Sequence, residues 1–129
     1  MINYKLAGLV KTKIGPCAVS QFENKTQQKK FQLLIFFPGI LDKKKGLWSR
    51  RRMFLLTEGP RLFYVDPDNM VLKGEIPWSN TLKPEIRDFK IFFVHTPGRV
   101  YYLIDPNSTA KDWCFAIDEV RQFYYGGSP

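Results

Sequence analysis

Short apolar runs, each ended by a strong turn signal, limit the folds open to this chain. Between residues 31 and 104 these runs are rich in Phe, Tyr, Leu, Ile and Val, and Gly, Pro, Asn and Asp separate them. Runs of this kind are typical of β-strands. Seven strands are predicted, at residues 31–37, 49–57, 61–65, 70–78, 81–86, 89–95 and 99–104. Pro38-Gly39 is expected to cut the first strand, so that Ile40 and Leu41 extend it only after a bulge or bend.

A different periodicity begins after residue 107. One helical face is predicted from the apolar positions Trp113, Ile117, Val120 and Tyr124, which recur at helical spacing. Ser108 or Thr109 is expected to cap this helix, with Asp112 completing a capping box. The fold class expected is therefore mainly β, a seven-stranded antiparallel barrel or sandwich capped by one C-terminal α-helix. Trp113 and its stripe are expected in the core.

The chain has 129 residues, enough for one domain with its own core. It is 44% hydrophobic and 16% aromatic, which excludes a disordered chain. Its net charge of +8 favours an acidic partner such as nucleic acid, an anionic membrane or a phosphorylated ligand. Beyond residue 37, most of the excess positive charge lies in one run.

That run is KKKGLWSRRR, from Lys43 to Arg52, in which six of ten residues are Lys or Arg. It is predicted to form a basic loop that leads into the second strand. Arg50 and Arg52 are two positions apart, so they share a strand face. Lys43, at the end of the preceding strand or in the loop, can fold back toward them. Three cations could then bind one small polyanion, although many basic runs are only solvated surface.

Other chemistries find little support in the sequence. Two cysteines are too few for a disulfide framework, and Cys114 is expected to be a buried thiol. With one histidine, no metal or cofactor site is predicted, and His95 has no evident triad partners. No signal peptide or membrane-spanning run is recognised, so a reducing, cytoplasmic setting is expected.

The strand order, the form Lys-x6-Arg-x-Arg and the helical Trp resemble a pleckstrin homology (PH) domain. Seven segments resemble, more closely, the C-terminal PH domain of the phosphoinositide-dependent protein kinases, which are serine/threonine kinases: KKKGLWSRRR, LLTEGP, YVDP, VLKGEIPW, FFVHTP, YYLIDP and KDWC. This resemblance covers about residues 42–124. The Gly-rich loop, HRD and DFG motifs of a kinase domain are absent, so the chain is not expected to be an enzyme.

The resemblance implies a phosphoinositide-binding module and assigns it a ligand. The expected ligands are inositol lipids phosphorylated at the 3-position, such as phosphatidylinositol 3,4,5-trisphosphate, and soluble inositol phosphates with the same headgroup. Lys43 and Arg52 would bind the 3-phosphate side, with further contacts from Lys45, Arg50, Lys73 and Arg99. Tyr64 would either offer its hydroxyl to a phosphate or be an ordinary core residue. Binding would recruit a signalling protein from the cytoplasm to the inner face of the plasma membrane.

Lys44, Trp48 and Arg51 also belong to the basic run, and their positions in it predict their roles. Lys44 and Arg51 alternate away from the pocket residues, so we expect them to provide general attraction to an anionic bilayer. Trp48 either packs under the loop or inserts at the membrane interface.

An alternative function is a protein or nucleic-acid interaction module that uses the same basic patch at residues 43–52. Aromatic residues next to Arg can stack on bases. However, Phe31–Phe37 and Phe89–Phe93 are predicted to be core strands rather than exposed platforms, so nucleic acid is the less favoured partner. The domain is expected at residues 38–125, preceded by an extension of unclear structure at 1–37 and followed by a tail at 126–129. No prediction of oligomeric state follows from the sequence.

Overall fold

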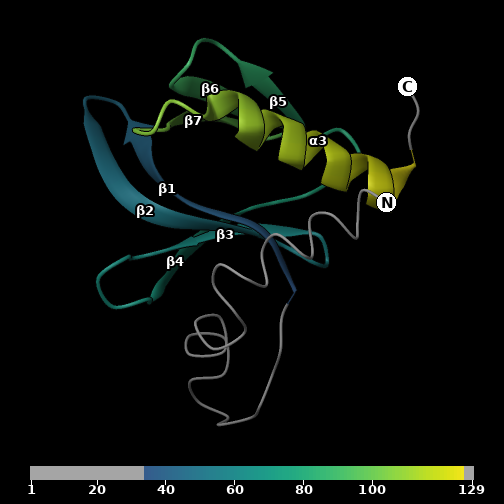
Figure 1. Cartoon of the computed structure of the whole chain (residues 1–129), viewed down its shortest axis with the longest axis horizontal. Coiled ribbons are helices and arrows are strands. Elements are labelled where there is room, and N and C mark those ends of the chain that lie inside the picture. The colour runs from purple at the N-terminus through teal and green to yellow at the C-terminus, as the bar shows by residue number, and fades with distance from the viewer. Residues whose placement is uncertain (1–33, 127–129) are drawn as a thin grey trace, which may run out of the picture.

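The computed structural model describes residues 34–126, and within them it contains one antiparallel sheet followed by one helix (Figure 1). The elements are β1 (Ile35–Lys45), β2 (Trp48–Thr57), β3 (Arg61–Val65), β4 (Leu72–Ile76), β5 (Lys83–Ile86), β6 (Ile91–Thr96), β7 (Arg99–Ile104) and α3 (Ala110–Tyr125). The seven strands lie in the order β4-β3-β2-β1-β7-β6-β5. The predicted fold class is confirmed. None of the described helices is long and apolar enough to cross a bilayer.

The long hairpin of β1 and β2 joins the two halves of the sheet. β1 pairs with β2 along almost its whole length, but with β7 only from Asp42 to Lys44. Beyond this short contact the two halves diverge, and α3 lies against β5 and β6 on the far side of the opening from β3 and β4 (Figure 1). The end of the hairpin projects away from α3. The tip therefore has few neighbours other than its own two strands.

Trp113 of α3 fills the space between the two halves. Its side chain is 2% exposed, and its ring centroid lies 4.7 Å from that of Phe37, 6.5 Å from that of Phe54 and 6.3 Å from that of Phe92. Ile117 and Val120 are also buried on the same helical face. The predicted core stripe of the helix is thus confirmed.

The prediction that Pro38-Gly39 cuts the first strand, with a bulge or bend before Ile40 and Leu41, is wrong, because the register shift lies between Ile35 and Phe37. β1 continues through both residues to Lys45, and only Gly46 and Leu47 connect it to β2. Pro38 is tolerated because β2 is the only strand paired with β1 at this point. At Gly39, an added Cβ would lie 2.8 Å from the Trp113 ring, so the absent side chain leaves room for the tryptophan. The three lysines of the basic run consequently lie on a strand, not in a loop.

The predicted capping box is also absent. The hydroxyl of Thr109 donates to the carboxylate of Asp105 instead of bonding to the first turn of α3. Asp105 is 2% exposed, and it also accepts the backbone N–H groups of Asn107 at 2.8 Å and Thr109 at 3.1 Å. A buried carboxylate needs several donors, and this requirement takes the hydroxyl that would otherwise cap the helix.

Three predicted strands are shorter in the structure, and one of these differences changes a predicted core residue. β4 covers 72–76 instead of 70–78, β5 covers 83–86 instead of 81–86, and β6 begins at Ile91 instead of Phe89. Phe89 lies in the turn before β6, where its carbonyl accepts the N–H of Ala110 at 3.1 Å. Its side chain is 81% exposed, so the expectation that it belongs to a core strand is wrong. β1 itself begins at Ile35, three residues before the domain boundary expected at residue 38.

Candidate anion-binding site

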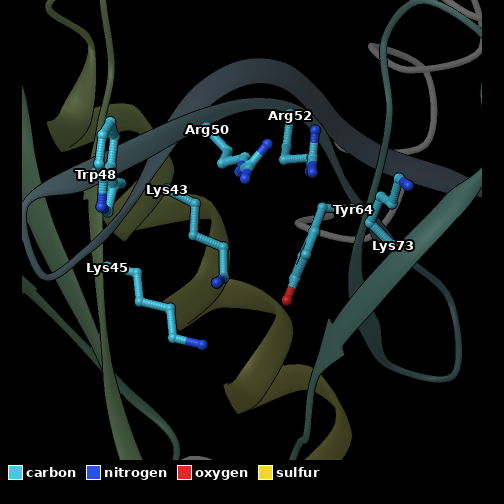
Figure 2. Close-up of a pocket in the computed structure, with 7 residues that line it drawn as sticks. All are labelled: Lys43, Lys45, Trp48, Arg50, Arg52, Tyr64 and Lys73. Atoms are coloured by element: carbon cyan, nitrogen blue, oxygen red, sulfur yellow. The ribbon is translucent and has the colours of Figure 1, made fainter.

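A pocket of about 420 Å³ opens beside the β1–β2 hairpin (Figure 2). Among the described residues, five of those that line it are cations and none is a carboxylate; they are Lys43, Lys45, Trp48, Arg50, Arg52, Tyr64 and Lys73. In Figure 2 the hydroxyl of Tyr64 and the amino groups of Lys43 and Lys45 are directed toward the same space. Six of the seven residues predicted for the site therefore line one pocket.

The register of the hairpin explains why four of these cations share a face. Lys43 is paired directly with Arg50, and Lys45 with Trp48. Residues paired across antiparallel strands lie on the same face, and alternate residues along each strand share it. Arg52, two positions after Arg50, therefore joins the group, as the alternation predicts.

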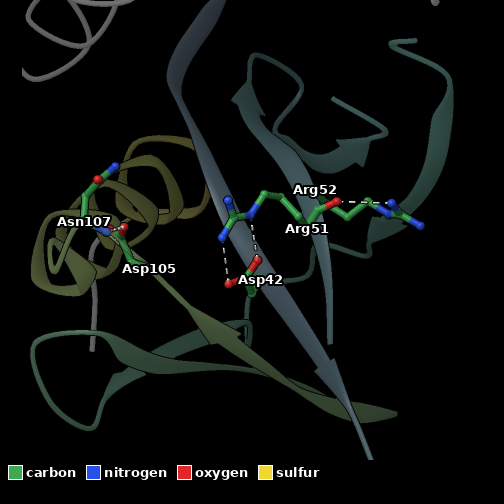
Figure 3. A network of polar contacts seen from close by, with 5 residues as sticks. All are labelled: Asp42, Arg51, Arg52, Asp105 and Asn107. Atoms are coloured by element: carbon green, nitrogen blue, oxygen red, sulfur yellow. Dashed lines mark hydrogen bonds and ion pairs between the residues drawn. The ribbon is translucent and has the colours of Figure 1, made fainter. Parts of the chain in front are cut away.

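Lys44 and Arg51 occupy the opposite face of the hairpin. The Arg51 guanidinium bonds to the Asp42 carboxylate, with Nε 3.1 Å from Oδ1, and this bond raises the pKa of Arg51. Figure 3 shows the side chains of Arg51 and Arg52 pointing in opposite directions. The amino group of Lys44 lies 4.9 Å from the ring centroid of Tyr102. The predicted orientation of both residues, away from the pocket, is thus observed.

Tyr64 is at once a core residue and part of the pocket wall. It is 9% exposed, and its ring lies 4.9 Å from that of Phe54 and 5.5 Å from the amino group of Lys43. Burial raises the pKa of its phenol, so the hydroxyl stays protonated and able to donate. The two interpretations of this residue in the sequence are therefore compatible.

Gly74 supports that position of Tyr64, and sequence reasoning missed it. It is paired with Tyr64 across β3 and β4, and an added Cβ would lie 2.6 Å from Cζ of the tyrosine. The ring therefore lies over the backbone of β4. A glycine inside a strand usually indicates only a weakened strand, and the role of Gly74 becomes apparent only from the strand register.

The cations of the pocket have no anionic partner among the described residues. The ion pairs there are Arg51–Asp42, Arg61–Glu75, His95–Glu85 and Arg121–Asp118, all outside the pocket. The pKa of Lys43 is lowered first by burial and then by the positive charges of Arg99, Lys45 and Arg52. Like charges held together without a counterion are the electrostatic condition for binding a multivalent anion.

Arg99 is the one predicted site residue that does not line the pocket. It lies at the start of β7, where its guanidinium stacks 4.4 Å from the ring centroid of Tyr101. Its charge nevertheless contributes to the lowered pKa of Lys43. In this conformation it belongs to the surroundings of the pocket.

The apolar tip of the hairpin adjoins the pocket. Leu47 is 96% exposed, and Trp48, which the sequence left open, is 76% exposed and lines the pocket rather than packing under a loop. Nothing in the lining offers a nucleophile paired with a base. What the site can do chemically is hold an anion with several charges beside an apolar surface.

Comparisons with known proteins agree with the fold and with the part of the chain that carries the site. A family model for the PH domain matches residues 20–126. The chain is 60% identical over 96 residues to 3-phosphoinositide-dependent protein kinase 1 of Rattus norvegicus, which covers 74% of this chain and 17% of the kinase. The corresponding kinase of Caenorhabditis elegans is 55% identical over 91 residues, covering 70% of this chain and 14% of the kinase.

A solved structure shows the same architecture. An N-terminally truncated linker-DH/PH fragment of p115-RhoGEF superimposes with a TM-score of 0.61 at 18% identity, covering 95% of this chain and 38% of that one. The chain spans less than a fifth of the two kinases above, and its match lies in their PH region. No kinase domain is present in these 129 residues.

Proposed function

The chain belongs to the PH domain family, and from this premise we propose that its basic pocket binds the headgroup of inositol lipids phosphorylated at the 3-position. Soluble inositol phosphates with the same headgroup would bind in the same way. Through this contact the domain would bring the chain, and any protein of which it forms part, to membranes that carry such lipids. The inner face of the plasma membrane is the site of recruitment that we propose.

One observation carries this proposal: five cations converge on one pocket, and no carboxylate is found among the described residues that line it. A headgroup with several phosphates needs several donors at once. The planar guanidinium groups of Arg50 and Arg52 can bind phosphate through two parallel hydrogen bonds, and the lysines act as compact point charges. The names of the similar kinases contain the word 3-phosphoinositide, which supports the choice of the 3-phosphate.

Within this pocket we assign the 3-phosphate to Arg52 and Lys43. Arg52 lies on β2 immediately before the buried segment that pairs with both β1 and β3, so its backbone is held on a rigid element. A bound phosphate would also offset the repulsion that lowers the pKa of Lys43. Tyr64 would add a hydroxyl donor, and Lys73 would close the side formed by β4.

The hairpin tip gives the same site a membrane-facing side. Leu47 and Trp48 are exposed next to the pocket entrance, so a headgroup in the pocket would bring both side chains to the interface. Trp is favoured at that depth of a bilayer because its ring is apolar and its N–H is polar. Lipid in a membrane should therefore bind more tightly than the free headgroup.

The decisive experiment compares Arg52→Ala with Arg51→Ala. Losing a charge-assisted contact to phosphate should cost roughly 2–5 kcal/mol, so Arg52→Ala should weaken binding of inositol 1,3,4,5-tetrakisphosphate by well over tenfold. Arg51 lies one position earlier and carries the same charge, but its side chain faces Asp42. Its substitution should change the affinity by only a few-fold, as measured by isothermal titration calorimetry.

Binding to a headgroup with phosphates only at positions 4 and 5 should depend less on Arg52, and the melting temperature should change little. Equal, small losses for the two variants would contradict the proposal, because they would mean that the patch acts only through diffuse charge. In that case a steep fall of nucleic-acid affinity with salt concentration would favour the alternative function.

A further inference from the structure

Ser49 lies in the middle of the basic hairpin, on the face opposite the pocket. It is exposed and is paired directly with Lys44, and Arg51 follows two positions later on the same face. Its hydroxyl makes none of the hydrogen bonds found among the side chains in the described part of the chain. The Ser108 hydroxyl shares this property, whereas the hydroxyls of Thr57, Ser79, Thr81, Thr96 and Thr109 are all engaged in such bonds.

The strand around Ser49 is extended and has one free edge. β3 pairs with β2 only from Met53 onward, so residues 48–52 have β1 as their single neighbour. Protein kinases bind substrate segments in extended form, and those with acidic grooves select Ser or Thr flanked by Lys and Arg. Here three lysines precede the serine at 43–45 and three arginines follow it at 50–52.

We propose that Ser49 is a phosphorylation site for a serine/threonine kinase that selects basic substrates, and that the modification releases the domain from membranes. In the reaction the Ser49 hydroxyl oxygen attacks the γ-phosphorus of Mg-ATP. The bond from that phosphorus to the β,γ-bridging oxygen breaks and ADP leaves. The hydroxyl proton passes to the kinase's own base.

The position of the phosphate determines its effect. A phosphoserine carries a charge of about −1.5 to −2 at neutral pH, and at Ser49 this charge would lie beside Lys44 and would compete with Asp42 for Arg51. It would more than cancel the net positive charge of Lys44, Arg51 and Asp42 on the outer face of the hairpin. Lys43, Lys45, Arg50 and Arg52 face the other way, so the pocket would keep its shape and donors.

The measurement of membrane binding rests on the proposed function, whereas phosphorylation of Ser49 can be tested without it. Attraction to an anionic bilayer should fall roughly tenfold, because each cation near such a surface contributes appreciably and the effect is screened by salt. Affinity for a soluble inositol phosphate, which contacts only the pocket, should change by less than about threefold.

The first arm of the test incubates the purified chain with Mg-ATP and the catalytic subunit of a basic-directed kinase, followed by peptide mass spectrometry. We expect one phosphate on Ser49 and none at that site in Ser49→Ala. A synthetic peptide of residues 43–52 serves as the positive control. If the peptide is phosphorylated and Ser49 of the folded chain is not, the hairpin shields the serine and the proposal is overturned.

The second arm compares Ser49→Glu with Gln122→Glu, which adds the same charge at an exposed position of α3. Sedimentation uses vesicles of phosphatidylcholine with phosphatidylserine, with and without phosphatidylinositol 3,4,5-trisphosphate. Ser49→Glu should bind both kinds more weakly, whereas Gln122→Glu should match the wild type. Equal effects of the two variants, or an equal loss for the soluble headgroup, would overturn the regulatory role. If the wild-type chain binds no soluble headgroup in calorimetry, the proposed function is wrong, and this result is distinct from the outcomes above.

Discussion

At the residue scale, the pocket depends on small structural features as much as on its cations. Tyr64 can face the pocket because Gly74, its partner on β4, has no side chain. Alternation along β2 places Arg51 on the face opposite the pocket, and Asp42, its direct partner on β1, holds its guanidinium there. Neither Gly74 nor Asp42 would touch a ligand, yet both determine which groups can.

Gly74→Ala should therefore damage the site without removing a charge. The new Cβ would lie 2.6 Å from Cζ of Tyr64, so the ring must move, and its neighbours Phe54 and Lys43 must adjust. We expect a loss of about 1–3 kcal/mol in the free energy of unfolding and a clear fall in headgroup affinity, measured by urea titration and calorimetry.

Gly98→Ala is the matched control, because an added Cβ there meets nothing within 4 Å. That variant should keep both its stability and its affinity. The same small effect for Gly74→Ala would mean that the tyrosine is not held over β4.

Cys114 should be an unreactive thiol at neutral pH. Burial, and secondarily the charge of Asp118, raise its pKa to about 11 from an ordinary value of 9.0. At pH 8 its thiolate fraction should then be about a hundredfold lower than that of a thiol with the ordinary pKa. Iodoacetamide should react slowly at pH 8 and about tenfold faster per pH unit up to about pH 11, because only the thiolate is nucleophilic.

Peptide mass spectrometry separates Cys114 from Cys17, which lies outside the described residues. A rate that levels off near pH 9 would contradict the raised pKa.

At the element scale, α3 and β1 depend on each other. The Trp113 ring lies over Gly39, and the far end of the helix is tied to the β2–β3 turn, where the N–H of Gly59 donates to the Tyr124 hydroxyl at 3.1 Å. The helix contributes nothing to the lining of the pocket. Its role is to hold the two halves of the sheet and, through β1, the base of the basic hairpin.

Trp113→Ala should accordingly lower the free energy of unfolding by about 3–5 kcal/mol, because it leaves a large cavity among Phe37, Phe54 and Phe92. Chemical denaturation followed by far-ultraviolet circular dichroism measures this loss. Phe115→Ala, two residues later on the same helix but 57% exposed, should change stability by well under 1 kcal/mol. Similar values for both variants would show that the helix is not packed through Trp113.

At the scale of the whole molecule, the cationic pocket and the buried apolar core occupy different places. Five cations gather at one pocket, the exposed Leu47 and Trp48 lie at the tip beside it, and the large buried side chains lie between the sheet and α3. This arrangement gives the domain one side suited to an anionic membrane. All lining residues come from the segment between Lys43 and Lys73.

Deleting residues 1–30 should therefore leave headgroup affinity within a few-fold of the full chain. This segment carries positive charge but lies outside the described residues, and the described lining residues all fall between Lys43 and Lys73. Calorimetry on the shortened chain provides the test, with circular dichroism to verify that it is folded. A large loss in a folded variant would show that the extension takes part in binding.

The sequence alone was sufficient for features that depend on local periodicity. Alternation along a strand placed Arg50 and Arg52 on one face and Arg51 on the other, and helical spacing placed Trp113 in the core, because both periods are properties of the backbone. Turn residues located six of the seven strands to within two positions, but they did not predict that β1 continues to Lys45. The family resemblance then supplied the assignment of the basic run to a headgroup.

Only the tertiary structure decided the features that depend on partners distant in the sequence. β1 passes through Pro38-Gly39 because β7 does not reach it there and Trp113 fills the place of the absent side chain. The Thr109 hydroxyl makes no capping hydrogen bond because Asp105 is buried and needs donors. Arg99 stacks on Tyr101 instead of lining the pocket, and Tyr64 faces the pocket only because the register sets Gly74 opposite it. In each case the free energy of a non-local contact outweighs a local preference.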